Sequence, residues 1–218
     1  LEGVLNNPDK PVAAIIGGSK VSTKIDVINF LLKKMDIIII GGAMANTFVA
    51  AKGLDVGTSL FEKECIDLAK ELIEKSQNNN CNLILPTDFI VSKNLKKNAE
   101  YTTTNFDSLP HNMMALDIGP KSIELINKNI NNCKTILWNG PLGAFETYPF
   151  DKGTNKVASH VSSLTKQKKI LSVAGGGDTV SALNNAKVLN DFSYVSTAGG
   201  AFLEWLEGKV LPGIEPIS

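Results

Sequence analysis

The chain alternates short, continuously apolar segments with longer amphipathic ones. The apolar segments are rich in Ile, Val and Leu, and we predict strands at residues 11–16, 36–40, 82–86, 114–118, 134–138, 169–174 and 193–196. Because the apolar residues are continuous and do not alternate with polar ones, both faces of each strand should be buried. This pattern is typical of the strands of a parallel sheet.

Helical patterns lie between the predicted strands. In residues 21–35, apolar side chains recur at spacings of three and four, which predicts a helix with one apolar face. Ser59 followed by Glu62 has the spacing of a capping box and predicts that a helix opens there. Gly119 followed by Pro120 predicts another helix start, and Asp151 is expected to cap a further helix.

The alternation of strands and helices predicts an α/β fold with right-handed crossovers. We expect a Rossmann-like parallel sheet of about six strands with helices on both faces, arranged in three layers. Residues 87–112 are polar and irregular and are expected to form a surface excursion with a hairpin. Since no linker or low-complexity tract interrupts the chain, residues 1–218 are expected to be one domain.

The charge balance narrows the classes of partner. Lys and Arg total 22, as do Asp and Glu, so nothing favours nucleic acid or an anionic membrane. No apolar run approaches the roughly 20 residues of a membrane helix, and residues 1–20 lack the pattern of a signal peptide. The 3 cysteines are odd in number and far apart, as in reduced proteins. We therefore expect a cytoplasmic protein. A monomer is expected as well, although none of these features indicates it.

Most glycines come directly after predicted strands. Twelve of the 18 do so: Gly17, Gly18, Gly41, Gly42, Gly119, Gly140, Gly143, Gly175, Gly176, Gly177, Gly199 and Gly200. In a parallel sheet these positions meet at the carboxyl edge, where the following helices also present free N–H groups that favour an anion. Tight turns alone would explain any single pair. The repeated pattern predicts a polyphosphate ligand lying on backbone amides.

The glycine pattern does not match the usual nucleotide fingerprints. The chain has no GxxxxGK[ST] motif, and GGGDTV, which begins at Gly175, places Val180 where a dinucleotide motif has its third glycine. An α/β module for a dinucleotide therefore remains an alternative, which preferential binding of NAD over ADP would favour. A lobe that only binds a partner protein is a second alternative.

Five polar residues near the predicted edge are candidates for ligand contacts. Lys20 and Lys24 are four residues apart at a helix start, where cations are unfavourable unless an anion binds. Asp178 and Thr179 follow the three glycines, and there they serve as an N-cap, as ligands of a nucleotide with its Mg²⁺, or as both. Glu146 follows a strand and is either a ribose acceptor or an exposed surface residue.

Several motifs together resemble one known family. In order, they are GGSKVSTKI (17–25), GGAMANTF (41–48), DVGTSLFE (55–62), LDIGP (116–120), ILWNGPLGAFE (136–146), AGGGDT (174–179) and STAGGAFLEWLEGKVLPG (196–213). They resemble the carboxy-terminal half of the phosphoglycerate kinases, over essentially the whole chain. The resemblance implies an enzyme of glycolysis and gluconeogenesis that transfers a phosphoryl group between 1,3-bisphosphoglycerate and Mg·ADP, giving 3-phosphoglycerate and Mg·ATP.

The resemblance also implies that the chain is one lobe of a two-lobed kinase. The carboxy-terminal lobe binds ADP or ATP, whereas the amino-terminal lobe, which is absent from this sequence, carries the 3-phosphoglycerate site. Residues 1–10 resemble the segment that leaves the hinge between the lobes. The chain alone is therefore expected to bind nucleotide but to be nearly inactive.

The resemblance assigns roles to the five polar candidates. Lys20 would stabilise the transferring phosphoryl group and is the catalytic lysine, while Lys24 would contact the nucleotide phosphates. Asp178 would hold Mg²⁺, and Thr179 would bind a phosphate. Glu146 would accept from the ribose. Positioning and charge neutralisation would then supply most of the catalysis.

The remaining implied contacts come from the backbone and from apolar residues. Adenine would lie near Gly41, Gly42 and Leu116. The amides of four glycines would cradle the transferring group, with Gly177 and Gly200 counted as catalytic: Gly176, Gly177, Gly199 and Gly200. The sequence departs from the family's pattern at Ser19, Ala43, Ala115 and Ala198, which changes the expected backbone approach at positions 43 and 198.

Overall fold

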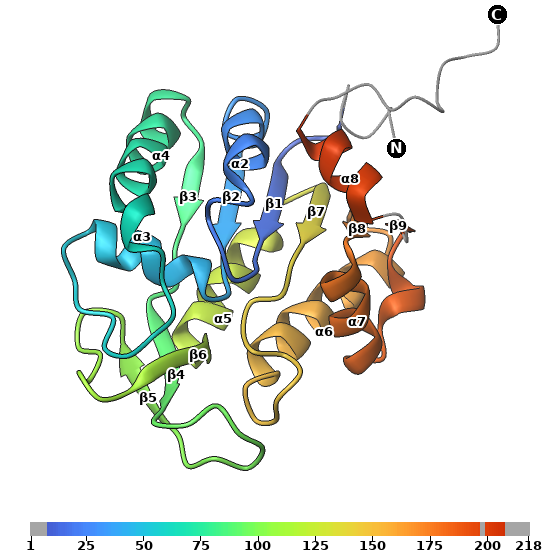
Figure 1. The fold of residues 1–218 in the computed structure, drawn as a ribbon. Coiled ribbons are helices and arrows are strands. Elements are labelled where there is room, and N and C mark those ends of the chain that lie inside the picture. Colours follow the sequence, from blue (N-terminus) through green and yellow to red (C-terminus); the bar gives the residue numbers. More distant parts are fainter. Residues whose placement is uncertain (1–7, 197–198, 208–218) are drawn as a thin grey trace, which may run out of the picture.

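The fold is built on one fully parallel sheet of six strands (Figure 1). The structure is a computed structural model that describes residues 8–196 and 199–207. In spatial order the strands are β3 (Asn82–Ile84), β2 (Ile37–Ile40), β1 (Val12–Ile16), β7 (Thr135–Asn139), β8 (Leu171–Gly175) and β9 (Tyr194–Ser196). All five neighbouring pairs are parallel. The predicted α/β fold with a parallel sheet of this size is confirmed.

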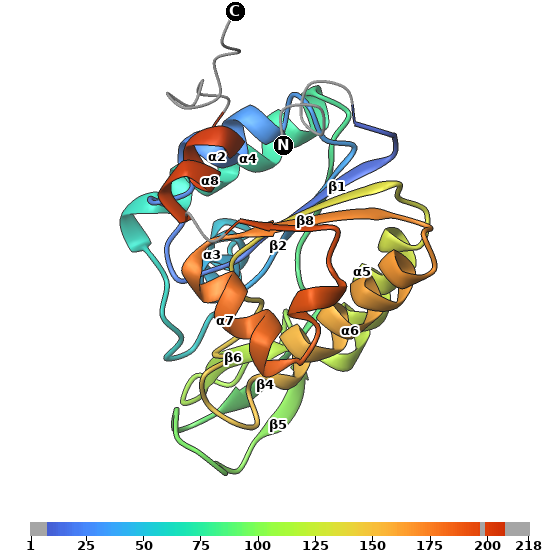
Figure 2. The same ribbon diagram turned by 90° about the vertical axis from the view of Figure 1, so that its right-hand side faces the viewer.

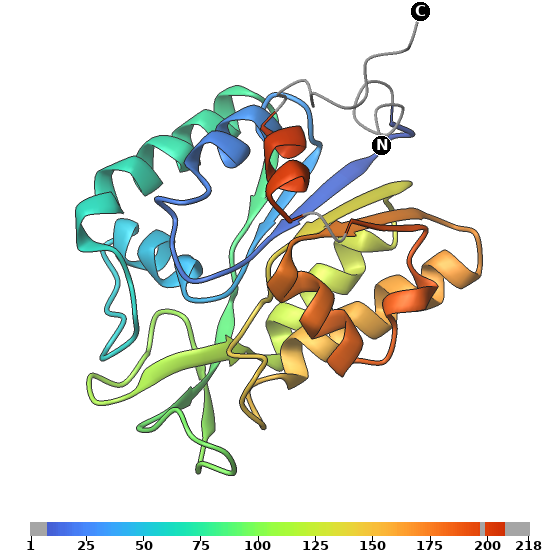
Figure 3. The ribbon, with the colours of Figure 1, turned by 45° about the vertical axis from the view of Figure 1, so that its right-hand side comes forward.

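Helices cover both faces of this sheet, as predicted (Figures 2 and 3). One face carries α2 (Ile25–Leu31), α3 (Met44–Ala51), α4 (Ile66–Asn78) and α8 (Gly199–Leu206). The other face carries α5 (Pro120–Ile130), α6 (Lys152–Lys166) and α7 (Gly177–Asn185). Two short 3₁₀ helices, η1 (Lys63–Cys65) and η2 (Leu189–Asp191), complete the helical elements of the described residues.

Strand β1 shows why the sheet lies in the middle layer. All five of its residues are buried. Since successive side chains of a strand point to opposite faces, Val12, Ala14 and Ile16 join the apolar cluster under α2 and α8. Ala13 and Ile15 join the cluster under α5 and α6. The continuous apolar pattern of this segment therefore reflects burial on both sides.

A second, antiparallel sheet lies beside the carboxyl ends of the parallel strands (Figure 1). It has the order β5 (Thr102–Asn105), β4 (Asp88–Ser92) and β6 (Met114–Ile118). The prediction that residues 114–118 belong to the parallel sheet was wrong, because they pair with β4. Residues 87–112 do contain an antiparallel pair, β4 and β5, but β4 is mostly buried and is more than a surface excursion.

Two buried carboxylates attach the small sheet to the helices of one face. Asp88 of β4 accepts hydrogen bonds from the N–H groups of Lys121 (3.0 Å) and Ser122 (2.7 Å) at the start of α5. Asp117 of β6 accepts one from the N–H of Gly153 (2.6 Å) at the start of α6. Each carboxylate thus satisfies N–H groups that a helix leaves free in its first turn.

Gly119 follows β6 and therefore does not lie at the carboxyl edge of the parallel sheet, contrary to our expectation. A Cβ atom at this position would lie 2.3 Å from the side-chain carboxyl carbon of Asp88. The absence of a side chain at this glycine is explained by the Asp88 carboxylate. Pro120 is the first residue of α5, as predicted.

The predicted capping box at Ser59 and Glu62 was wrong. Ser59 Oγ accepts a hydrogen bond from the N–H of Ala115 (2.8 Å), and Glu62 Oε2 accepts one from the N–H of Ser22 (3.0 Å). Both side chains serve distant segments, and α4 begins only after η1. Asp151 occupies the N-cap position of α6, but its carboxylate accepts from the side-chain amide of Asn155 (2.9 Å).

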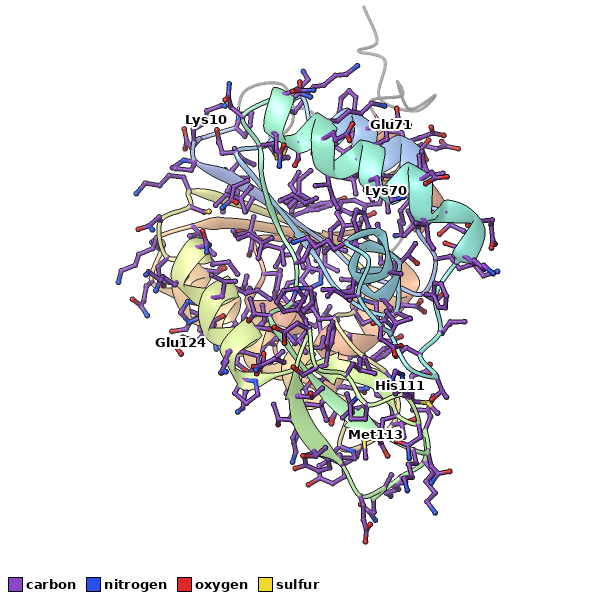
Figure 4. All side chains as sticks on the ribbon, turned by 90° about the vertical axis from the view of Figure 1, so that its left-hand side faces the viewer. Lys10, Lys70, Glu71, His111, Met113 and Glu124 are labelled. Atoms are coloured by element: carbon purple, nitrogen blue, oxygen red, sulfur yellow. The ribbon has the colours of Figure 1, made fainter. Side chains whose placement is uncertain are left out.

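Charged side chains occupy the outer surfaces of the helical layers. Figure 4 labels Lys70 and Glu71 on α4, and Glu124 on α5, which are all exposed. None of the described helices is long and apolar enough to cross a membrane.

Candidate nucleotide site

Two adjoining cavities lie at the carboxyl edge of the parallel sheet. The larger, of about 300 Å³, is mostly apolar, and we name it the apolar cavity. The second, of about 280 Å³, lies among the glycines after β1, β7 and β8, and we name it the glycine cavity. Gly18, Ser19 and Asp178 line both cavities, so the two form one continuous site.

The apolar cavity lies between the two sheets. Its apolar walls come from Leu60, Phe89, Leu95, Met114, Leu116, Pro141 and Leu142. The pairing of β4 with β6 skips Leu116, because Ile90 pairs with Asp117 and Val91 with Ala115. Such a bulge reorients a residue at the rim of a site. The carbonyl of Leu116 instead accepts from the N–H of Ala144 (2.7 Å), which holds the 141–144 loop against the cavity.

The glycines after β2 have different roles in the apolar cavity. Gly42 lines it and has φ +69°, a conformation that favours glycine. Gly41 is buried behind the wall, since a Cβ atom there would lie 2.2 Å from a methyl group of Leu142. Ala43 has φ −65°, so this position does not require the glycine that the family pattern led us to expect.

Lys24 is the half-buried cation of the glycine cavity. It occupies the N-cap position of α2 and donates a hydrogen bond from Nζ to Oδ1 of Asn139, the last residue of β7. Burial lowers its pKa from 10.5 to about 8, although the nearby charge of Asp178 opposes this shift. A cation that loses hydration in this way gains most when an anion enters the cavity.

Asp178 and Thr179 lie in the first turn of α7, but their environments differ. Asp178 is exposed and lines both cavities. Thr179 is buried, and its Oγ1 accepts a hydrogen bond from the N–H of Gly140 (2.7 Å). Thr179 therefore joins the loop after β7 to the helix after β8, in addition to lining the glycine cavity.

The fold explains two of the three glycines after β8. A Cβ atom on Gly175 would lie 2.3 Å from the ring of Phe202, so this position is closed by packing. Gly176 has φ +97°, which a residue with a side chain rarely adopts. Gly177 has neither constraint, since a Cβ atom there would have no protein atom within 4 Å. Only Gly177 lacks an explanation within the fold, and it borders the glycine cavity.

Two of the predicted polar site residues, Lys20 and Glu146, are not among the lining residues of these cavities, and Gly41 lies behind the wall of one of them. Lys20 is exposed, on the turn before α2, and its charge acts on Glu62. Glu146 is exposed and lines a third, open cavity of about 490 Å³ together with Lys96 and other residues. Gly200 lies in the first turn of α8, after β9.

The structure also places residues in the site that the sequence reasoning missed. Asn139 directly precedes Gly140 after a strand, so the rule that selected the glycines could have found it. Leu60 and Leu95 come from two separate connections, and both are more than half exposed at the rim of the apolar cavity. No local pattern indicated Leu95, because the segment around it is polar and has no helix or strand periodicity.

The donor set fits a cation that arrives with its ligand. In the part of the chain that the structure describes, no three His, Cys, Asp or Glu side chains cluster closely enough to hold a metal. Asp178 offers one exposed carboxylate beside the glycine cavity. Mg²⁺ often takes one or two carboxylates and completes its shell with phosphate oxygens and water, and this site suits that mode.

Comparison with known proteins points to a single family. The family model described as phosphoglycerate kinase matches residues 1–209. The phosphoglycerate kinase of Sinorhizobium medicae is 52% identical over 215 residues, which is 99% of this chain and 54% of that protein. The phosphoglycerate kinase of Brucella melitensis is 54% identical, with the same coverage of both chains. This chain thus spans about half the length of the curated relatives it matches.

Solved structures agree with the sequence comparison. The phosphoglycerate kinase of Coxiella burnetii superposes with a TM-score of 0.91 at 44% identity, covering 96% of this chain and 53% of that one. The enzyme from Pyrococcus horikoshii superposes with a TM-score of 0.79 at 26% identity, covering 96% and 52%.

Proposed function

Because this chain belongs to the phosphoglycerate kinase family, we propose that it is the nucleotide-binding part of a kinase that uses 1,3-bisphosphoglycerate and Mg·ADP. A β-phosphate oxygen of ADP attacks the acyl phosphate, a new P–O bond forms, and the bond to the carboxyl oxygen breaks. The carboxylate leaves as 3-phosphoglycerate, and the nucleotide leaves as ATP. The same transfer runs in reverse from ATP.

The observation that carries this proposal is the continuity of the two cavities. A nucleotide has an apolar base at one end and a polyanion at the other. The apolar cavity suits the base, and the glycine cavity, with Lys24 and the N-terminus of α7, suits the phosphates. Asp178 borders both, where a Mg²⁺ ion bound to phosphate oxygens needs a carboxylate.

The polar residues of the glycine cavity have distinct tasks in this function. Lys24 neutralises phosphate charge, and Asn139 holds its ammonium in place. Asn139 is fixed in turn, because its Nδ2 donates to the carbonyl of Gly175 (2.7 Å). Thr179 fixes the first turn of α7 through its bond to Gly140, and the free N–H groups of that turn would be available to the phosphates. Bound Mg²⁺ would add charge neutralisation of the phosphate oxygens, with Asp178 as its protein ligand.

Three predicted contacts require the ligand to extend past the lining residues of the two cavities. Lys20 follows Ser19, which lines both cavities, and would contact the transferring group beyond the last nucleotide phosphate. Glu146, which lines the third cavity together with Lys96 and Lys97, would accept from the ribose. Gly200, at the start of α8, would contribute an N–H to the transferring group.

The site for 3-phosphoglycerate is assigned to the part of the relatives that this sequence does not cover. We therefore expect the chain of residues 1–218 to be the nucleotide-binding lobe, to bind nucleotide as a monomer and to show no turnover alone. A cytoplasmic location is supported by its three cysteines, which are all buried and free. Detectable conversion of 3-phosphoglycerate and ATP by this chain would contradict the expectation of inactivity.

Calorimetric titration with ADP tests the nucleotide site. We expect saturable binding, which Asp178→Ala weakens about tenfold when Mg²⁺ is present and hardly at all in its absence. Asp26→Ala, on an exposed position of α2, is the matched control. A folded chain that binds NAD in preference to ADP, or binds neither, would contradict the proposal.

Gly177→Ala tests whether the phosphates contact the backbone. Since a Cβ atom at this position meets no protein atom, we expect unchanged or slightly higher stability in urea denaturation. Affinity for ADP should nevertheless fall about tenfold, because the methyl group would enter the space of the phosphates. Ser181→Ala, exposed on the same helix, should change neither quantity. Unchanged affinity for Gly177→Ala would show that no ligand group rests there.

A further inference from the structure

The carboxylate of Glu62 is bound to the turn that carries Lys20, although the two lie far apart in the sequence. Glu62 Oε2 accepts from the N–H of Ser22 (3.0 Å), and Oε1 accepts from its hydroxyl (2.5 Å). The N–H of Val21 also contacts this carboxylate, and the charge of Lys20 acts on it. Three consecutive residues, Lys20 to Ser22, therefore interact with one carboxylate.

These interactions favour the ionised form of Glu62. Partial burial alone would raise its pKa, but the hydrogen bonds from Ser22 and Val21, together with the charge of Lys20, lower it on balance. A carboxylate that accepts N–H groups just before a helix is favourably placed. Its position fixes the backbone next to Lys20, and the hydroxyl of Thr23 adds a bond to the carbonyl of Lys20 (3.0 Å).

The segment that supplies Glu62 also forms part of the apolar cavity. Leu60 lines that cavity, and its carbonyl accepts from the side-chain amide of Asn46 (3.0 Å). The N–H of Glu62 donates to Oγ1 of Thr47 (3.0 Å). Asn46 and Thr47 are neighbouring residues of α3, exposed by only 1% and 0%. Residues 60–62, which we name the strap, are thus fixed on a rigid helix.

We propose that Glu62 is a positioning residue that holds the Lys20 turn for phosphoryl transfer and connects it, through the strap, to the base end of the site. This inference rests on the proposed function, because Lys20 is the residue expected to contact the transferring phosphoryl group. The strap extends from Leu60 at the apolar cavity to Glu62 at the Lys20 turn. A base in the cavity packs on the segment that orients the lysine at the other end of the ligand.

The ratio of ATP affinity to ADP affinity tests this role, because only ATP carries the group that Lys20 would contact. In calorimetric titrations with Mg²⁺, we expect Glu62→Ala to lower the affinity for ATP about tenfold and the affinity for ADP by less than about twofold. Glu62→Gln retains an acceptor for the N–H of Ser22 and should recover most of the ATP affinity. Glu64→Ala, exposed in η1, is the matched control.

A double-mutant cycle with Lys20 separates positioning from general support of the fold. If Glu62 acts through Lys20, Glu62→Ala should add nothing to the loss of ATP affinity in a Lys20→Ala background. If Glu62→Ala lowered the affinities for ATP and ADP equally, the strap would only shape the apolar cavity. If the losses of ATP affinity in Glu62→Ala and Lys20→Ala were additive, Glu62 would act independently of Lys20. Either result overturns the inference while leaving the proposed function intact. A folded wild-type chain that binds neither nucleotide overturns both.

Discussion

Lys24→Met is expected to make the folded chain more stable at pH 7 and to lower its affinity for ATP about 100-fold. The half-buried ammonium is costly without an anion, and its pKa near 8 lies well below the ordinary 10.5. This difference corresponds to about 3 kcal/mol of destabilisation at pH 7. Methionine removes this penalty, but Asn139 then loses its hydrogen-bond donor. We therefore expect a net gain in stability of about 2 kcal/mol.

The destabilising contribution of Lys24 should depend on pH. Below pH 8 the folded and the unfolded chain both carry the charge of Lys24, so the burial penalty is fully present. Between pH 8 and 10.5 the folded chain releases this proton first, and the contribution of Lys24 to stability rises with pH. In Lys24→Met this rise is absent. Urea denaturation of the wild type and of Lys24→Met, at pH 7 and at pH 9.5, measures this change in unfolding free energy.

The affinity for ATP should change with pH in the opposite direction. Because only the ammonium form of Lys24 attracts phosphate, wild-type affinity should fall about tenfold between pH 7 and pH 9. The affinity of Lys24→Met should be nearly constant over this range, and Lys33→Met, exposed in the turn after α2, should behave like the wild type. A wild-type affinity that is independent of pH would contradict the assignment of Lys24 as a phosphate contact.

Asp88→Ala is expected to destabilise the chain by about 3–5 kcal/mol. Its buried carboxylate accepts from the N–H of Lys121 and from both the N–H and the hydroxyl of Ser122. Alanine would leave these donors without a partner in a dry environment and would detach β4 from α5. Thermal or urea denaturation measures the loss.

Two comparisons make the Asp88 prediction specific. Asp107→Ala removes an exposed carboxylate from the connection after β5 and should change the unfolding free energy by less than about 0.5 kcal/mol. Asp88→Asn keeps the shape of the side chain but places an amide NH₂ near backbone donors, so it should also be destabilising. A loss below about 1 kcal/mol in Asp88→Ala would show that α5 does not depend on this carboxylate.

The apolar pattern was enough to predict the parallel sheet, because a strand that is buried on both faces is continuously apolar within its own short segment. Strands at 11–16, 36–40 and 134–138 were found within one residue of their observed bounds. The same pattern could not assign residues 114–118 to the second sheet. A buried strand is apolar whichever sheet it joins, and its partner β4 is distant in the sequence.

The candidate site was only partly predictable for a related reason. Glycines after parallel strands meet at one edge by topology, so Gly42, Gly176 and Gly177 were expected at that edge, and they line the two cavities there. Leu95 could not be found, because it comes from the connection after β4 and reaches the apolar cavity only through the position of the small sheet.

Periodicity and glycine are local properties, so the order of residues was sufficient to locate the strands and the positions without a side chain. The contacts of each polar residue depended on how the elements pack together. Ser59 and Glu62 have the spacing of a capping box, yet they bind Ala115 and Ser22. A hydrogen bond between residues 40 positions apart depends on how helices and sheets pack, which no local pattern records. The same packing explains the glycine at position 175, where a Cβ atom would meet the ring of Phe202.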